Sequence, residues 1–280
     1  MVISVRPRKE RKRPERTPDG RMSLTDHLRE FRNRLFISAL AIIVGTIVAW
    51  VFYDPILALL TDPFNGVRAD LLKQGIHTKS TVNGVSSSFL LQSKVSLVAG
   101  IVGTSPIWLY QMWAFIMPGL HRNEKRWTIL FVAVAGPLFF AGVLLGYIVL
   151  PKGLSVLIGF TPDHVVNLID LNDYLTFVIR VLLVFGVAFE IPLFVVMLNL
   201  AGVVRAKQLA RWRGWIIFLT FVFAAVATPS TDPITMLLLA FPMIVLFLIS
   251  ELIARVIDRR RGRNRDPDYA DFDDDEISPI

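Results

Sequence analysis

One glutamate, Glu190, interrupts an apolar run that extends from Phe185 to Pro192. Counted along an α-helix, Glu190 lies about ten residues, or about 15 Å, from the nearer end of its hydrophobic segment, which is close to the middle of a bilayer. An ionised carboxylate at that depth costs several kcal/mol unless it is protonated, paired or hydrated. We therefore expect Glu190 to face a polar cavity or a partner; the alternative is a protonated side chain bonded to a neighbouring helix.

Two further carboxylates, Glu30 and Glu124, lie in basic segments beside hydrophobic runs. Each has a structural explanation, because Glu30 can pair with Arg34 four residues later and Glu124 with its basic neighbours. A functional interpretation is also open. Carboxylates at a membrane surface can receive guanidinium groups through paired charged hydrogen bonds, a geometry that lysine does not reproduce. These two residues would then distinguish arginine from lysine on a ligand.

The sequence carries no sign of enzymatic chemistry. It has no Walker-type glycine loop, no His-Glu-x-x-His and no Gly-x-Ser-x-Gly motif, and its four histidines lie outside the hydrophobic segments. The chain has no cysteine, which excludes disulfides, thiolate catalysis and cysteine-held metal centres. We therefore predict no catalytic residue, no cofactor and no metal.

Membrane-spanning helices must position these side chains. Of the 280 residues, 54% are hydrophobic and only 19% are charged, and long windows carry no charge at all. Six segments can cross about 30 Å of hydrocarbon: 35–53, 95–117, 127–150, 174–204, 212–229 and 234–254. The fifth is the shortest, so we expect a thinner bilayer beside it. The predicted fold is an all-α integral membrane protein with six transmembrane helices in one domain, residues 23–257.

Lysine and arginine gather on one side of this arrangement. Residues 1–34, 118–127, 201–213 and 255–265 hold 24 of the 30 basic residues, whereas the opposite connections hold five. Because basic residues concentrate on the cytoplasmic side of membrane proteins, both termini are predicted to be cytoplasmic. The same placement accounts for the net charge of +7 without a nucleic acid as partner.

Charged tails are expected on both sides of the membrane domain, a basic one over 1–22 and a mixed-charge one over 258–280, both disordered. Before the first span, Ser23 and Asp26 resemble a helix-capping box, followed by apolar residues at helical spacing. This pattern predicts a short amphipathic helix on the membrane surface. Prolines within the spans permit kinks, which would curve the bundle into a concave face: Pro106, Pro137, Pro192 and Pro242.

Four ordered blocks of sequence are specific enough to identify a family. They are DHLREFRNRL at 26–35, YQMWAFIMPGL at 110–120 followed by Glu124, FGVAFEIP at 185–192, and TPSTDP at 228–233. From about residue 23 to residue 257 the chain resembles the TatC family, the multispanning receptor subunit of the twin-arginine protein translocase. It departs from the family's usual pattern at Phe31, Asn33 and Thr231 and in its long charged tails.

The resemblance implies a non-enzymatic receptor for the twin-arginine signal peptides of folded cargo proteins. It also implies the roles of particular residues. Signal-peptide binding falls to Glu30, Arg32, Phe115 and Glu124, the intramembrane polar site to Glu190, and the functional positions of the outer loops to Pro63 and Asp232.

The same resemblance implies partners and an energy source. We expect single-span subunits of the TatA and TatB type, a homo-oligomer within a receptor complex, the bilayer of the cytoplasmic (inner) cell membrane, and transport driven by the proton-motive force. The absence of a nucleotide motif agrees with this energy source. The alternative function is a proton-coupled small-molecule transporter, because a buried glutamate and kinked helices would suit that task as well.

Overall fold

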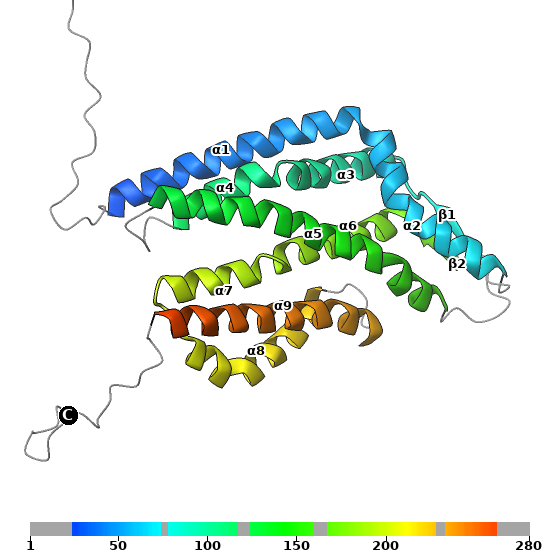
Figure 1. The fold of residues 1–280 in the computed structure, drawn as a ribbon. Helices are drawn as coiled ribbons and strands as arrows, with labels where there is room; N and C mark the ends of the chain where they lie inside the picture. Colours follow the sequence, from blue (N-terminus) through cyan, green and yellow to red (C-terminus); the bar gives the residue numbers. More distant parts are fainter. Residues whose placement is uncertain (1–23, 74–77, 117–123, 160–166, 228–232, 262–280) are drawn as a thin grey trace, which may run out of the picture.

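The structure is a computed structural model that describes residues 24–73, 78–116, 124–159, 167–227 and 233–261, almost all of them helical (Figure 1). The predicted tail 1–22 and nearly all of the predicted tail 258–280 lie outside these residues. The described elements, in chain order, are α1 (Leu24–Val51), α2 (Tyr53–Lys73), β1 (Thr78–Thr81), α3 (Ser87–Gly103), α4 (Ser105–Ile116), α5 (Glu124–Gly159), β2 (Asn167–Asp170), α6 (Leu171–Ala188), α7 (Ile191–Leu200), α8 (Ala206–Ala227) and α9 (Pro233–Arg260).

Six membrane crossings account for most of these helices. Among the described residues, five segments are long and apolar enough to cross a membrane: Thr25–Val51, Ile129–Gly159, Leu171–Leu200, Ala206–Val226 and Met236–Arg260. The pair α3 and α4, bent by 58°, supplies the sixth. Large apolar side chains stay exposed along α1, among them Phe36 and Ile47, as expected for a surface that meets lipid. The predicted all-α class with six membrane-spanning segments is confirmed.

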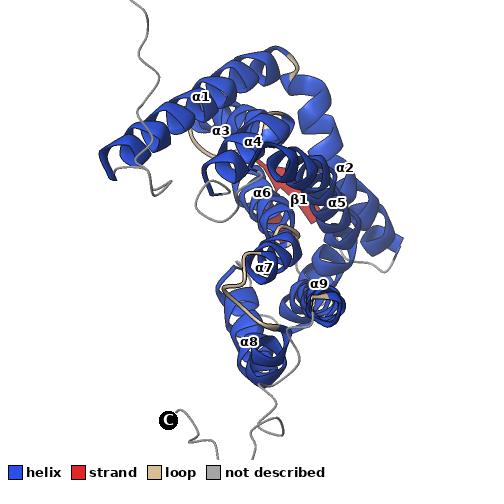
Figure 2. Cartoon of the chain, turned by 60° about the vertical axis from the view of Figure 1, so that its left-hand side comes forward, coloured by secondary structure: helices blue, strands red, loops and turns tan. Residues whose placement is uncertain are grey.

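The helices pack in three tiers that are visible in Figure 1. The first tier is α1 with α3 and α4, the second is α5 with α6, and the third is α7 with α9 and α8. In Figure 2 the helices follow a curve from α1 through α6 and α7 to α8. The bundle has two ends: a terminal end, where α1, α5 and α8 begin and α4, α7 and α9 end, and a cap end, formed by α2, β1 and β2 (Figure 1).

The helix α1 differs from expectation at its start. The sequence predicted a separate amphipathic helix before the first span, but residues 24–34 form the first turns of α1 itself. The reason is that no glycine or proline interrupts the chain between Leu24 and Gly45, so the amphipathic turns continue directly into the apolar ones.

Two spans are broken, each just before a proline. The span of α3 and α4 breaks at Thr104, where Pro106 cannot donate to the carbonyl oxygen of Val102; the indole of Trp108 donates to the adjacent carbonyl of Ile101 at 2.9 Å. The span of α6 and α7 breaks at Phe189 and Glu190, and Pro192 follows in the first turn of α7. Each break leaves a longer helix toward the cap end and a shorter helix toward the terminal end.

Two tyrosine hydroxyls fasten α2 to the bundle at the cap end. Pro63, buried within α2, has no N–H to donate to the carbonyl of Leu59, and the hydroxyl of Tyr147 donates to that oxygen at 3.0 Å. The hydroxyl of Tyr174 donates to the next carbonyl, that of Leu60, at 2.7 Å. This arrangement gives a structural account of the proline at residue 63.

A small parallel ladder, which the sequence did not predict, completes the cap end. In it β1 pairs with β2 from Thr78 opposite Asn167 to Thr81 opposite Asp170. Asp170 then caps α6, because its Oδ1 accepts the N–H of Asn172 at 2.7 Å and its Oδ2 accepts from the amide of Asn83 at 2.9 Å. The ladder therefore fixes the point at which α6 enters the bundle.

Candidate functional site

Glu30 lies on α1 at the terminal end, where α1 meets α4. Arg34, one turn later, donates to Glu30 Oε1 from Nε at 2.9 Å and from Nη2 at 2.5 Å, and also donates to the side chain of Gln111 on α4 at 3.4 Å. The other carboxylate oxygen, Oε2, is shielded from solvent and has no hydrogen-bond partner among the described residues. One oxygen of Glu30 thus already binds a guanidinium, and the other is available to a second donor.

A cluster of aromatic rings joins α1 to α4 near Glu30 in the sequence of α1. Phe115 on α4 stacks on His27 with a ring-centroid distance of 4.5 Å and an interplanar angle of 17°, and it also contacts Phe31 at 5.1 Å. His27 and Phe31 flank Glu30 on α1, so the ring of Phe115 lies beside the acidic residue. Arg32 is exposed on the same helix. The structure therefore brings Glu30 and Phe115 to one surface, with Arg32 on the same turns of α1.

Two of the site residues predicted from the sequence cannot be placed as side chains. Glu124 is the first residue of α5, at the terminal end, but its side chain lies outside the described residues. Asp232 lies wholly outside them. Their roles stay predictions.

Glu190 lies at the break between α6 and α7, with its side chain buried. The indole of Trp113 on α4, which is fully buried, lies near this carboxyl group. Within the described part of the chain, neither carboxyl oxygen of Glu190 nor Nε1 of Trp113 completes a hydrogen bond. Buried polar groups without partners are rare in native structures and usually have a functional explanation.

The short helix α4 connects these two places. Phe115 and Gln111, four residues apart, contact α1, whereas Trp113 packs against Phe131 on α5 and Phe194 on α7. Successive helical residues turn by about 100°, so residue 113 lies on the opposite face of α4 from residues 111 and 115. A change in the tilt of α4 would move the surface around Phe115 and the surroundings of Glu190 together.

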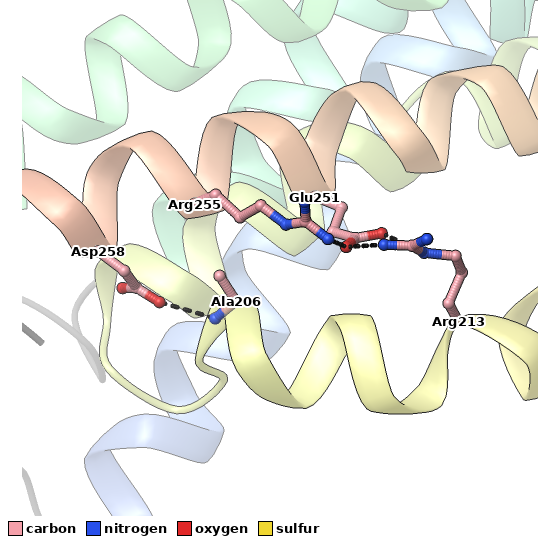
Figure 3. A network of polar contacts seen from close by, with 5 residues as sticks. All are labelled: Ala206, Arg213, Glu251, Arg255 and Asp258. Atoms are coloured by element: carbon pink, nitrogen blue, oxygen red, sulfur yellow. Dashed lines mark hydrogen bonds and ion pairs between the residues drawn. The ribbon is translucent and has the colours of Figure 1, made fainter. Parts of the chain in front are cut away.

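A second polar network, which sequence reasoning missed, joins α8 to α9 at the terminal end (Figure 3). Glu251 is buried and accepts two hydrogen bonds from Arg213 on α8, at 2.9 and 2.6 Å, and one from Arg255 on its own helix, at 2.5 Å. Figure 3 shows the carboxylate between the two guanidinium groups. The only local sign of this network in the sequence is the spacing of four residues between Glu251 and Arg255.

Asp258 extends this junction about two turns further along α9. Its side chain is fully buried; Oδ2 accepts the N–H of Ala206, the first residue of α8, at 2.7 Å, and Oδ1 accepts from the amide of Asn199 on α7 at 3.0 Å (Figure 3). Asp258 therefore caps α8 from another helix and holds α7, α8 and α9 together.

The remaining contacts of the candidate site include residues that the sequence did not single out as site residues. His27 and Gln111 both contact it, and they stand inside two of the four blocks of sequence that identified the family. The described residues contain no group of three or more histidine, aspartate or glutamate side chains that could hold a metal ion.

Comparisons with known proteins agree on one family. A family model described as "Sec-independent protein translocase protein (TatC)" matches residues 26–242. The TatC protein of Frankia casuarinae is 43% identical over 286 residues, which covers 100% of this chain and 78% of that protein. The TatC protein of Aquifex aeolicus is 34% identical over 243 residues, which covers 86% of this chain and 98% of that protein.

Solved structures give the same result. A crystal structure of the twin arginine translocase receptor TatC superimposes with a TM-score of 0.71 at 33% identity, covering 82% of this chain and 98% of the other. A second, of the same receptor in the detergent DDM, gives a TM-score of 0.69 at 33% identity, with 81% and 99% covered. The chain therefore belongs to the TatC family and is a multi-pass membrane component of a Sec-independent protein translocase.

Proposed function

We propose that this chain is the receptor subunit that recognises twin-arginine signal peptides, and that Glu30 and Glu124 bind the paired arginines at its terminal end. The observation that supports the proposal is the hydrogen bonding of the Glu30 carboxylate. Arg34 occupies one carboxylate oxygen with two N–H donors, while the other oxygen has no partner in the described part of the chain. The crystal structures that this chain resembles are those of the twin arginine translocase receptor TatC.

The geometry of Arg34 explains why arginine would be preferred to lysine in the signal. A guanidinium is planar and presents several N–H groups in a fixed fork, so it can satisfy a carboxylate with two hydrogen bonds at once. An ammonium group is a compact point charge without that fork. Phe115, stacked on His27 beside Glu30, adds an apolar and aromatic wall against which a guanidinium plane can lie.

In this proposal the apolar stretch of the signal peptide follows the concave face toward Glu190. The break at Glu190 places a carboxyl group without hydrogen-bond partners, within the described residues, at the junction of two half-helices. A carboxyl group so placed remains available to polar backbone or water that accompanies a translocating segment. Pro63 and Asp232 act at the opposite face of the membrane in this scheme, Pro63 by holding α2 where Tyr147 fastens it.

The remaining parts of the proposal follow from the family and from the distribution of charge. Both termini lie in the cytoplasm, and the chain resides in the cytoplasmic (inner) membrane, where it forms a homo-oligomeric receptor complex with single-span subunits of the TatA and TatB type. The proton-motive force drives export of the folded cargo, and the chain itself catalyses no reaction.

The decisive experiment measures binding of two signal peptides, one with Arg-Arg and one with Lys-Lys, to the wild type, Glu30→Gln and Glu124→Gln. We expect the wild type to prefer Arg-Arg, and each variant to lose most of this preference, because a charged bidentate hydrogen bond contributes about 1.5–3 kcal/mol, or roughly tenfold or more in affinity. Equal affinity in all six combinations would falsify the proposal.

A separate experiment tests the role of Glu190. In Glu190→Leu a buried carboxyl without partners becomes apolar, so we expect the folded chain to be retained or stabilised by about 1–3 kcal/mol, while transport of folded cargo slows. Glu190→Gln, which keeps a polar group of the same shape, should transport faster than the leucine variant. Transport by Glu190→Leu at the wild-type rate would show that the residue serves packing alone.

A further inference from the structure

A basic pocket lies at the terminal end, where the chain turns from α7 into α8. Gly202, with a φ of +82°, permits the turn, and the cavity beside it has a volume of about 450 Å³. Its lining comes from the turn and the first two turns of α8: Gly202, Val203, Arg205, Lys207, Gln208 and Arg211. The pocket contains none of the residues proposed for signal-peptide binding.

The two arginines of this pocket have no carboxylate partner among the described residues. Arg205 and Arg211 are both exposed and take part in no ion pair there, whereas Arg213, two residues further on, is held by Glu251. Gln208 is already used within the turn, since its Oε1 accepts the N–H of Arg205 at 2.8 Å. The pocket therefore presents uncompensated positive charge on side chains that are free to reorient toward an anion.

The start of α8 does not itself supply the attraction for an anion. The N–H of Ala206 is already bound by the buried carboxylate of Asp258. The charge that a ligand would meet is therefore that of the arginine side chains.

Neighbouring aromatic residues mark the depth of the pocket relative to the bilayer. Trp212 and Trp215 follow directly on α8 with 61% and 65% of their surfaces exposed, and Trp215 packs edge-on against Phe218. Exposed tryptophans of membrane proteins sit at the level of the lipid headgroups. Beyond them the exposed face of α8 is apolar, with Leu219 and Val222 next along the helix. A basic pocket, a tryptophan belt and an apolar helix face thus follow one another in the order of a phospholipid's phosphate, glycerol and acyl chains.

We propose that this pocket binds the headgroup phosphate of an anionic phospholipid, with the acyl chains lying along the exposed face of α8. Arg205 and Arg211 donate to the phosphate, a geometry that guanidinium groups suit. In the proposed orientation this end of the bundle meets the cytoplasmic leaflet, whose anionic lipids attract basic pockets between transmembrane helices. A free phosphate ion would make the polar contacts without the apolar ones and would bind far more weakly.

The test uses the full-length chain in phosphatidylcholine nanodiscs, to which phosphatidylglycerol is added, with bound lipid counted by native mass spectrometry. Each basic residue near a membrane surface contributes about fivefold in affinity, so Arg205→Gln/Arg211→Gln should lose at least tenfold in phosphatidylglycerol retention. The matched control, Arg68→Gln/Lys79→Gln, removes two exposed cations at the cap end and should retain lipid like the wild type. Equal retention of phosphatidylglycerol by all three chains would overturn the proposal. So would equal retention of phosphatidylcholine and phosphatidylglycerol by the wild type, or displacement of the lipid by millimolar inorganic phosphate.

A second measurement does not depend on the folding of the arginine variant. In the wild-type chain, brominated phosphatidylglycerol should quench tryptophan fluorescence more strongly than brominated phosphatidylcholine. The excess quenching should disappear in Trp212→Phe/Trp215→Phe, because these rings lie beside the pocket, and should persist in Trp50→Phe, which removes another exposed tryptophan from α1. If the wild type shows no excess quenching by brominated phosphatidylglycerol, or if the double tryptophan variant keeps it unchanged, the lipid does not bind at this pocket.

Discussion

Arg34 donates from two of its nitrogens to a single oxygen of Glu30, and the second oxygen of that carboxylate has no hydrogen-bond partner in the described part of the chain. Both side chains belong to α1, so the pair forms without help from another helix. In the proposed function, an arginine of the signal peptide must share this carboxylate with Arg34 or displace it. The internal pair therefore sets the affinity of the site as well as its chemistry.

Arg34→Gln is expected to tighten binding of an Arg-Arg signal peptide by about two- to fivefold. An ion pair at a partly exposed position contributes about 0.5–1 kcal/mol, and the ligand no longer competes with it. Peptide titration against the purified receptor measures the effect. The control is Arg29→Gln, which removes the same charge from an exposed position of α1. Weaker binding by Arg34→Gln, comparable to that of Glu30→Gln, would mean that Arg34 itself holds the ligand.

Gly100→Ala is expected to destabilise the chain by about 1–3 kcal/mol through steric overlap. A β-carbon at Gly100 would lie 2.5 Å from the backbone nitrogen of Thr46, because α1 and α3 approach each other closely there. Gly103→Ala, three residues later on α3, meets no atom within 4 Å and should be neutral or slightly stabilising. Thermal unfolding in detergent compares the two variants, and equal melting temperatures would contradict the close approach of α1 and α3.

Tyr174→Phe is expected to cost about 1–2 kcal/mol and to increase hydrogen exchange in α2. The lost bond, to the carbonyl of Leu60, is buried and only 2.7 Å long. Tyr147→Phe removes the bond to Leu59, which is more accessible, and should cost less. If the amides of α2 exchange at the wild-type rate in both variants, the two hydroxyl groups do not hold this helix in place.

Glu251→Gln is expected to lower the melting temperature by several degrees, because two guanidinium groups lose the carboxylate that holds them. Arg255→Gln should have a smaller effect, since the two bonds from Arg213 that cross from α8 to α9 remain. The measurement is thermal unfolding of the purified chain with a dye-free light-scattering readout. A larger drop in melting temperature for Arg255→Gln than for Glu251→Gln would mean that the contact within α9 matters more than the one between α8 and α9.

Hydropathy alone predicted the fold because the solvent of this protein is mostly hydrocarbon. A charge-free apolar segment of about 20 residues has few stable alternatives to a spanning helix, so the six crossings could be read from the sequence. Prolines were less informative. Pro106 and Pro192 stand just after breaks, whereas Pro137 and Pro242 lie inside the continuous helices α5 and α9. The outcome depends on donors near the break, such as the indole of Trp108 for the carbonyl of Ile101, which the sequence does not reveal.

The contacts that hold the site together were the least predictable part. Arg213 and Glu251 are 38 residues apart, and Arg34 and Gln111 are 77 apart, so no local pattern links either pair. The strands β1 and β2 are four residues each, and neither TKST nor NLID alternates between apolar and polar residues, so no strand pattern can be recognised. Glu190, by contrast, was conspicuous because a carboxylate is rare within an apolar segment.

The two helix breaks separate a well-connected cap end of the bundle from a terminal end that is built of short helices. At one end, α2, the short β-ladder and two tyrosine hydroxyls form a rigid frame. At the other end, α4 and α7 are short helices of 12 and 10 residues, and each follows a break, at Thr104 and at Glu190. If the chain exports folded proteins as proposed, tilting of α4 and α7 could make room for a bulky cargo at the terminal end while the contacts at the cap end stay in place.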